Sequence, residues 1–312
     1  MRCCNMAQIT NKEKNFISAV VYLHDCAGQV ESFFDRLLAR LEEHFDYYEI
    51  VAVNDGCTDD TVARLKEFAA GRMEKPLTIL NMSLHQGVEQ AMNAGLDAAI
   101  GDFVFEFDSL DTPYPAEMIW QAYETALTGF DVVTVSPSRQ KTASKAFYAL
   151  FNAFSNSIYK LESDAFRLVS RRAINRVKAI SENLPYRKAA YAASGLACKT
   201  LHFEGSIRGQ QEARLDKAID SLALYTNTGY KISFGISCAM ALLTLIALVY
   251  TVVVWLVGEP VTGWTTTMLV LSGGLAGMFV ILTIAVKYLS LLVDLVFRKQ
   301  AYLIEGIEKI QK

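Results

Sequence analysis

The sequence has 312 residues, a formal net charge of −3 and 52% hydrophobic residues, with a mean hydropathy of +0.21. The slightly acidic balance argues against general binding to nucleic acid, because proteins of that class present an excess of basic residues. The hydropathy is too high for an ordinary soluble domain, and the six cysteines show no C-x-x-C spacing, so the sequence indicates neither a zinc site nor a disulfide framework.

From residue 16 onward, short apolar runs alternate with segments of helical periodicity. Residues 1–15 are polar and predict an N-terminal tail, not a secretory signal. Strands are expected at 16–23, 48–53, 77–80, 103–107 and 131–135, with helices at 30–43, 59–70, 88–100 and 115–127. This alternation predicts an α/β domain with a mostly parallel sheet covered by helices on both faces. In such sheets ligands bind beyond the carboxyl ends of the strands.

Acidic residues gather where two of these strands end. Asp55 follows the second strand, and Asp108 and Asp111 follow the fourth. A structural explanation stays open for both clusters, because Asp forms turns and Thr58 or Asp59 fits the cap of the next helix. A carboxylate at a strand end can also accept a hydrogen bond from a base or ribose, which favours a nucleotide site. The first strand is not followed by G-x-G-x-x-G, which disfavours a dinucleotide oxidoreductase.

Two later segments are predicted to lie at a membrane surface. Apolar residues form one helical stripe within 144–161, which fits an interfacial helix, although a core-facing helix would show the same stripe. Residues 211–231 would form a juxtamembrane helix. Basic residues flank the first segment, namely Arg139 before it and Arg167 and Arg171 after it. They are candidates to bind an acceptor phosphate, with a solvated basic face as the alternative.

Two uncharged apolar runs follow, at 232–257 and 260–286, and each exceeds the ~20 residues that cross a bilayer. Lysine and arginine lie outside the pair but not between the runs, so the positive-inside rule predicts cytoplasmic ends. We therefore expect a multi-pass protein of the cell (inner) membrane, with a two-span region at 232–297 and a cytoplasmic tail at 298–312. Small residues in the second run would allow close helix packing in a homo-oligomer: Ser272, Gly273, Gly274 and Gly277.

The strand-end clusters also carry a resemblance to a known family. VNDGCTDDT (53–61) resembles the V-D-D-G-S-T-D-G-T signature of family 2 inverting glycosyltransferases, which have the GT-A fold. HQGVEQAMNAGLDAAIGDFVFEFD (85–108) resembles the segment leading into that family's Asp-x-Asp motif. The likeness continues through DAFRLVSRRAINRV (164–177) and the two apolar runs. The branch with this order of motifs includes dolichyl-phosphate mannose synthase and bacterial polyprenyl-phosphate glycosyltransferases.

The resemblance implies a cytoplasmic GT-A domain at 16–210, with a Rossmann-like sheet. It implies transfer of a sugar from a nucleotide sugar to polyprenyl (undecaprenyl) phosphate, with inversion, for cell-envelope polysaccharide. Asp55 would contact the nucleotide base. A divalent cation, Mg²⁺ or Mn²⁺, would bind Asp108 and Asp111, because Leu110 stands where the motif has its second aspartate. The residues implied for nucleotide-sugar binding are Tyr22, Asp25, Asn54, Asp55, Gly87 and Asp108.

The chain departs from the family at several of these positions. Asn54 replaces an aspartate of the first signature, and Ala165 stands where the family has a proposed base, so that Asp164 is displaced by one residue. The resemblance implies Asp108, Asp111 and Asp164 as candidate catalytic residues. The departures leave an alternative, a degenerate relative that binds a nucleotide sugar or a partner enzyme without turnover.

Overall fold

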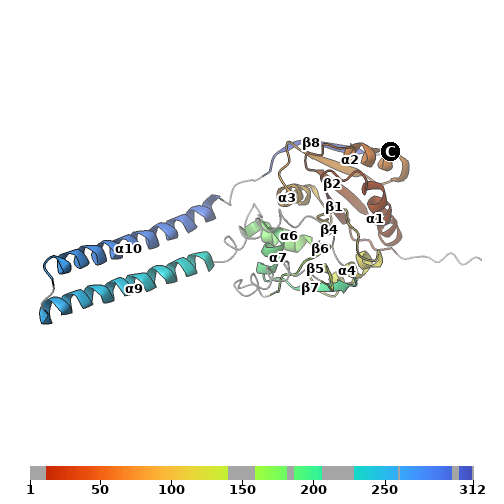
Figure 1. Cartoon of the computed structure of the whole chain (residues 1–312). Helices are drawn as coiled ribbons and strands as arrows, with labels where there is room; N and C mark the ends of the chain where they lie inside the picture. The colour runs from red at the N-terminus through yellow and green to blue at the C-terminus, as the bar shows by residue number, and fades with distance from the viewer. Residues whose placement is uncertain are drawn as a thin grey trace, which may run out of the picture. The chain divides into compact units, whose positions relative to one another are not determined.

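A computed structural model describes residues 12–139, 159–180, 186–205, 228–258, 261–296 and 302–310. The chain divides into two compact units, one holding a sheet with its helices and the other two long helices (Figure 1). The first unit comprises Met1–Ala218 and Lys299–Lys312, and the second is Ile219–Arg298. Most of the predicted tail at 1–15 lies outside the described residues, as do most of the interfacial helix predicted at 144–161 and of the juxtamembrane helix predicted at 211–231.

The first unit alternates strands and helices as expected, then continues with a mixed second half. Its elements are β1 (Ile17–Leu23), α1 (Val30–His44), β2 (Tyr48–Asn54), α2 (Thr61–Arg72), β3 (Leu77–Met82), α3 (Val88–Ala98), β4 (Phe103–Phe107), α4 (Glu117–Leu127), β5 (Val132–Pro137), β6 (Phe166–Ser170), α6 (Arg171–Ile180), α7 (Arg187–Ala193), β7 (Cys198–Phe203) and β8 (Ile304–Ile310).

These strands form one sheet of eight strands in the order β7-β5-β6-β4-β1-β2-β3-β8. The pairs β1–β2, β1–β4, β2–β3 and β5–β7 are parallel, whereas β6 runs antiparallel to β4 and β5, and β8 antiparallel to β3. The sheet is therefore mostly parallel, which confirms the predicted fold class. β8 lies within the segment predicted as a tail, 298–312, and the sequence pattern did not indicate it; Figure 1 shows this blue strand beside the red and orange elements.

Burial explains why these segments form their elements. Every residue of β1 is buried, as expected for a central strand covered on both faces. The buried residues of α1 recur three or four positions apart and face the sheet: Val30, Phe33, Phe34, Leu37, Leu38 and Leu41. Gly95 of α3 lets that helix approach closely, because a Cβ there would lie 2.5 Å from Val20 Cγ1.

The parallel strands β1, β2 and β4 end at the same edge of the sheet, which we call the carboxyl edge. Leu23 lies opposite Asn54, and Val21 lies opposite Phe107. The segments that follow these strands therefore meet in space although they are far apart in sequence. Both acidic clusters identified in the sequence lie at this edge.

The second unit consists of α9 (Thr228–Val257) and α10 (Trp264–Val296), which lie side by side in Figure 1. Phe234–Val257 and Trp264–Val286 are long and apolar enough to cross a membrane, with mean hydropathies of 2.6 and 2.4. Within the most apolar part of each helix only 6% is buried, whereas the core helix of a soluble domain would be mostly buried. Their exposed apolar surface fits a lipid environment.

Candidate active site

Asp55 joins the ends of β1 and β2 to the loop before α3. Its side chain is 0% exposed. One carboxylate oxygen accepts hydrogen bonds from Tyr22 Oη at 2.9 Å and from Gly87 N at 2.8 Å, and the other accepts from Gln86 N at 2.7 Å. Gly87 has a φ of 90°, a conformation that favours glycine. Asp55 thus fixes the backbone of this loop; in this conformation its carboxylate has no exposed surface.

Two histidines cover Asp55 at the carboxyl edge. The rings of His24 and His85 stack with centroids 4.1 Å apart and an interplanar angle of 25°. Nδ1 of His24 lies 2.9 Å from the backbone oxygen of Asp55, and Nδ1 of His85 lies 3.0 Å from its carboxylate. Side-chain exposures of 26% and 54% leave part of both rings accessible. The pair offers a flat surface on which a base could stack. The sequence analysis did not identify it.

Asp25 and Asn54 hold the loop that follows β2. Asp25 has a φ of 43°, and its carboxylate accepts a hydrogen bond from Thr58 N at 2.7 Å. This bond helps to hold the pKa of Asp25 below its ordinary value. Asn54 accepts from Cys57 N at 3.0 Å and donates to Asn81 Oδ1 at 2.9 Å. Both residues therefore shape the loop that surrounds Asp55.

A second cluster lies at the end of β4, where two buried arginines bind Asp108. Arg167 Nη2 donates to one oxygen of Asp108 at 2.5 Å, and Arg187 Nη2 donates to the other at 2.6 Å. The same guanidinium groups bind Glu106, at 3.1 Å from Arg167 and 2.5 Å from Arg187. Burial raises the pKa of Glu106 above its ordinary value, although the two arginines oppose the shift.

The cluster extends to α3, α7 and the residues before β6. Arg187 Nε donates to Glu89 Oε2 at 2.9 Å, and Arg167 Nε donates to Asp164 Oδ2 at 3.0 Å. Lys188 forms an ion pair with Asp164. Burial raises the pKa of Asp164, but Arg167 and Lys188 outweigh it and hold that pKa below its ordinary value. Four carboxyl groups thus face three cationic side chains, an arrangement that compensates most of the buried charge.

A polar row crosses the sheet from this cluster. Glu106, Arg167, Thr134 and Thr200 lie in register on β4, β6, β5 and β7. Thr134 Oγ1 and Thr200 Oγ1 are hydrogen-bonded at 3.0 Å. Beside this row is a cleft of about 200 Å³, lined also by Lys188 of α7. It places cationic side chains and hydroxyl groups next to the Asp108 cluster.

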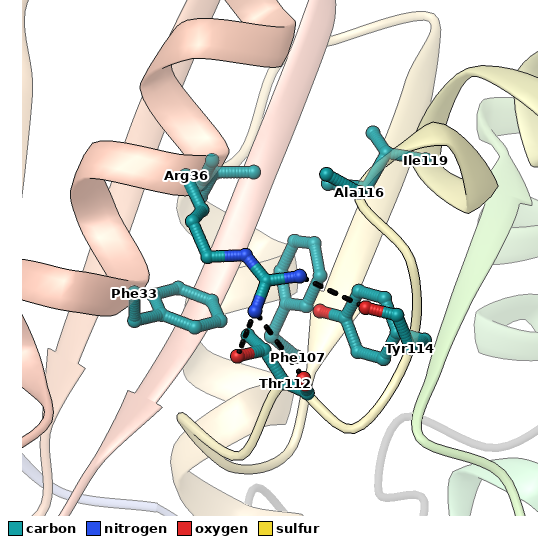
Figure 2. Close-up of a pocket in the computed structure, with 8 residues that line it drawn as sticks. Phe33, Arg36, Phe107, Thr112, Tyr114, Ala116 and Ile119 are labelled. Carbon is teal, nitrogen blue, oxygen red and sulfur yellow. Dashed lines mark hydrogen bonds between the residues drawn. The ribbon is translucent and has the colours of Figure 1, made fainter. Parts of the chain in front are cut away.

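Arg36 of α1 holds the segment that follows Asp108 (Figure 2). Its guanidinium donates to Thr112 Oγ1 at 2.7 Å and to the backbone oxygen of Tyr114 at 2.9 Å. The gap beside it measures about 10 Å³, too small for a ligand. Leu110 is 5% exposed in the core, whereas Asp111 is partly exposed and has no hydrogen bond or ion pair within the described residues.

The donor chemistry at Asp108 and Asp111 fits a hard divalent cation. Asp111 offers a carboxylate that the described part of the chain leaves unpaired, and Asp108, three residues earlier, contributes a second carboxylate group. Hard cations such as Mg²⁺ and Mn²⁺ prefer such oxygens. A further group, Asp25, Cys57 and Asp59, brings ligand atoms within 4.8 Å of one another. Asp25 and Asp59 already accept backbone hydrogen bonds.

The structure separates the three predicted phosphate-binding arginines. Arg167 lies in the Asp108 cluster. Arg139 is exposed and lies two residues after β5, a strand that also ends at the carboxyl edge. Arg171 lies at the opposite end of β4, where it donates to the backbone oxygens of Gly101 and Ala99 at 2.9 and 2.7 Å. Arg171 therefore binds the backbone that leads into β4, and the structure does not bring it to Asp108.

The sequence analysis also missed several members of the Asp108 cluster. Glu106 carried a visible signal, since it is an acidic residue inside an apolar strand. Glu89, Arg187, Lys188 and Tyr191 carried none, because their positions become adjacent only in the fold. Tyr191 Oη donates to Glu106 Oε1 at 2.6 Å, which completes the set of partners around that carboxyl group.

The mostly parallel sheet, with carboxylates at its carboxyl edge, is consistent with the GT-A fold of nucleotide-sugar transferases. A solved structure with this fold is a mannosyltransferase of Pyrobaculum calidifontis, in complex with GDP-mannose and Mn²⁺, with a TM-score of 0.52 and 14% identity over 91% of this chain and 87% of that one. The profile of Glycosyl transferase family 2 matches residues 18–190, and the chain belongs to this family of glycosyltransferases.

Relatives in this family include proteins named for polyprenyl acceptors. A prophage bactoprenol glucosyl transferase homolog of Escherichia coli is 30% identical over 55% of this chain and 58% of its own length. An undecaprenyl-phosphate 4-deoxy-4-formamido-L-arabinose transferase of Aeromonas hydrophila is 29% identical over 44% and 43%. An uncharacterized glycosyltransferase of Synechocystis is 28% identical over 64% and 64%. The chain thus spans less than two thirds of each of these relatives.

Proposed function

We propose that this glycosyltransferase moves a sugar from a nucleotide-sugar donor to a polyprenyl phosphate on the cytoplasmic leaflet, with inversion at the anomeric carbon. The observation that carries the proposal is the meeting of the Asp55 loops and the Asp108 cluster at one edge of a GT-A sheet. The two apolar helices and the polyprenyl-linked relatives support a lipid acceptor.

The donor nucleotide is assigned to the loops around Asp55. Asp55 orients the backbone of Gln86 and Gly87, and the His24–His85 pair receives the base by stacking. Tyr22, Asp25 and Asn54 hold the surrounding turns. In this assignment Asp55 acts through the loop that it holds, since its carboxylate is enclosed by protein groups.

Asp55→Asn is expected to weaken nucleotide binding. An asparagine NH₂ group would face at least one backbone N–H that now donates to the carboxylate, at a cost of about 1–3 kcal/mol. Calorimetry with UDP and GDP measures the affinity, and far-ultraviolet circular dichroism should show an intact fold. Asp60→Asn is the matched control, because Asp60 is exposed at the start of α2 and makes no side-chain capping bond. Equal affinities in the two variants would reduce Asp55 to a turn residue.

The Asp108 cluster is assigned to the diphosphate and the acceptor phosphate. Asp108 and Asp111 would hold the divalent cation, which neutralises the charge that develops on the departing diphosphate. The acceptor phosphate is mostly dianionic at neutral pH and needs no strong base. Asp164 then serves to hold Arg167 and Lys188 beside the cleft, where they can attract that phosphate. Arg139 adds a cation just after the carboxyl end of β5.

Connectivity supports two membrane crossings. The chain enters α9 from the first unit, and after α10 it returns to that unit as β8. A chain that crosses a bilayer twice ends on the side where it began. In this proposal the sheet and the C-terminal strand lie on one side, and the flanking basic residues support a cytoplasmic location for that side.

Reporter fusions test this topology. A reporter after Lys312 should give a cytoplasmic signal, and one inserted at 259–262, between the helices, should give an external signal. A cytoplasmic signal from the insertion would contradict two crossings and would remove the membrane placement of the site.

The proposed activity is tested with membranes that contain the protein, a panel of radiolabelled nucleotide sugars and undecaprenyl phosphate. Label should enter the organic phase with at least one donor. Nucleotide binding without any such label would favour the alternative of a relative that binds without turnover, an alternative consistent with the arginine-bound Asp108 and the buried Leu110.

A further inference from the structure

The C-terminal strand β8 reaches the loops that surround Asp55. β8 covers the outer edge of β3, pairing Ile310 with Leu77 and Ile304 with Met82. Just before β8, the backbone oxygen of Leu303 accepts a hydrogen bond from Ser83 N at 3.2 Å. Residues 54–59, which start at the last residue of β2, and residues 83–87, which follow β3, are called here the donor loops. β8 and the residue before it are therefore close to both.

Gln86, in the second donor loop, is both a hydrogen-bond donor and an acceptor toward the C-terminal segment, by which we mean residues 303–310. Its side-chain Nε2 donates to the backbone oxygen of Leu303 at 2.8 Å, and its Oε1 accepts from Leu303 N at 3.0 Å. The side-chain amide thus pairs with Leu303 as a neighbouring strand would. The backbone N of Gln86 donates to Asp55. One residue therefore couples Asp55 to the C-terminal segment.

Asn81 connects β8 to the first donor loop. Its Nδ2 donates to Glu308 Oε1 at 2.9 Å, and its Oδ1 accepts from Asn54 Nδ2 at 2.9 Å. Asn54 in turn accepts from Cys57 N within that loop. Lys66 of α2 forms an ion pair with Glu308 at 2.5 Å, which holds the Glu308 side chain next to Asn81. Two independent routes therefore lead from the C-terminal segment to the donor loops.

We propose that β8 is a component of the donor site, which holds both donor loops in their nucleotide-binding conformation through the positioning residues Gln86 and Asn81. The proposal rests on the proposed function for the identity of the ligand. Residues 297–301 alone separate α10 from this segment. The donor site is then complete only after both apolar helices have been synthesised and β8 has joined the sheet.

Amide hydrogen exchange of the full chain in detergent micelles, without ligand, tests the positioning. Gln86→Met removes both side-chain bonds to Leu303 at similar length. It should speed exchange at the amides of positions 86 and 87 about tenfold, as expected for two lost hydrogen bonds, while β1 keeps its protection. Gln86→Glu keeps the acceptor for Leu303 N but sets a carboxylate oxygen against the Leu303 carbonyl oxygen, so its exchange should be at least as fast as that of Gln86→Met. Lys309→Met, at an exposed position of β8, should exchange like the unmodified protein.

Calorimetry with UDP and GDP then tests the link to the donor. The affinity of the unmodified protein for the nucleotide it binds should fall about tenfold in Gln86→Met, at least as far in Gln86→Glu, and not in Lys309→Met. Equal exchange in the methionine variants, or faster exchange with unchanged affinity, would overturn the proposal. Failure of the unmodified protein to bind any nucleotide or to transfer any sugar would instead refute the proposed function, and the exchange rates would still decide whether β8 holds the loops.

Discussion

Replacing Arg187 by methionine is expected to lower the free energy of unfolding by about 3–5 kcal/mol, because it leaves buried carboxylates without their counter-charge. Arg187 is 0% exposed and donates to Glu89, Glu106 and Asp108. Methionine fills part of the space but cannot bind any of these groups. Urea unfolding of the full chain in detergent, followed by circular dichroism, measures the loss.

Arg172→Met is the matched control. Arg172 also binds a carboxylate, with its Nε 2.9 Å from Asp131 Oδ1, but its side chain is 72% exposed. Asp131 is buried, but it keeps a hydrogen bond from Ser170 Oγ at 2.8 Å and loses only a solvated guanidinium, so the expected change is smaller, about 1 kcal/mol. Similar losses in the two variants would show that burial does not set the importance of Arg187.

The deficit of Arg187→Met should depend on pH. Burial raises the pKa of Glu106, and Arg187 is the largest influence that lowers it. Without Arg187 this pKa rises further above its ordinary value, so the folded state binds more protons than the unfolded state between the two values. Stability then increases as pH falls in that window, and the deficit should be smaller at about pH 5.5 than at about pH 8. A deficit that grows toward acid would contradict the assignment.

Asp108→Asn is expected to slow sugar transfer by about 10²–10³-fold, the loss typical of a removed electrostatic contact to the reacting groups. The change keeps the shape of the side chain but removes the charge that would bind the cation. Asp111→Asn should instead raise the cation concentration required for half-maximal rate, since Asp111 is the ligand that the described residues leave unpaired. Rates are measured over a Mn²⁺ titration, with thermal midpoints as the check on folding. Full activity of the unmodified protein in EDTA would refute the cation assignment.

The first half of the sheet could be predicted from local pattern alone. β1 to β4 are apolar runs, and the helices between them show apolar residues at helical spacing. β8 could not, because its isoleucines at 304, 307 and 310 recur every third residue, a spacing more typical of a helix. Pairing with the edge of β3 determines its strand conformation, and that partner is more than two hundred residues away.

The candidate site was predictable to the extent that it lies at strand ends. Asp55 and Asp108 follow apolar strands, so their convergence at the carboxyl edge could be inferred. Their partners could not be inferred, because a sequence does not show which cation compensates a buried carboxylate. Arg187 lies 79 positions from Asp108 and on a short helix, and only the fold brings the two together.

The proposed transfer is best tested on the products of the purified full chain in nanodiscs, supplied with the donor that the panel identifies. We expect one lipid-linked sugar for each nucleoside diphosphate released, strict dependence on undecaprenyl phosphate, and an anomeric configuration opposite to that of the donor. Release of diphosphate without lipid-linked sugar, or a lipid product that retains the donor configuration, would contradict it.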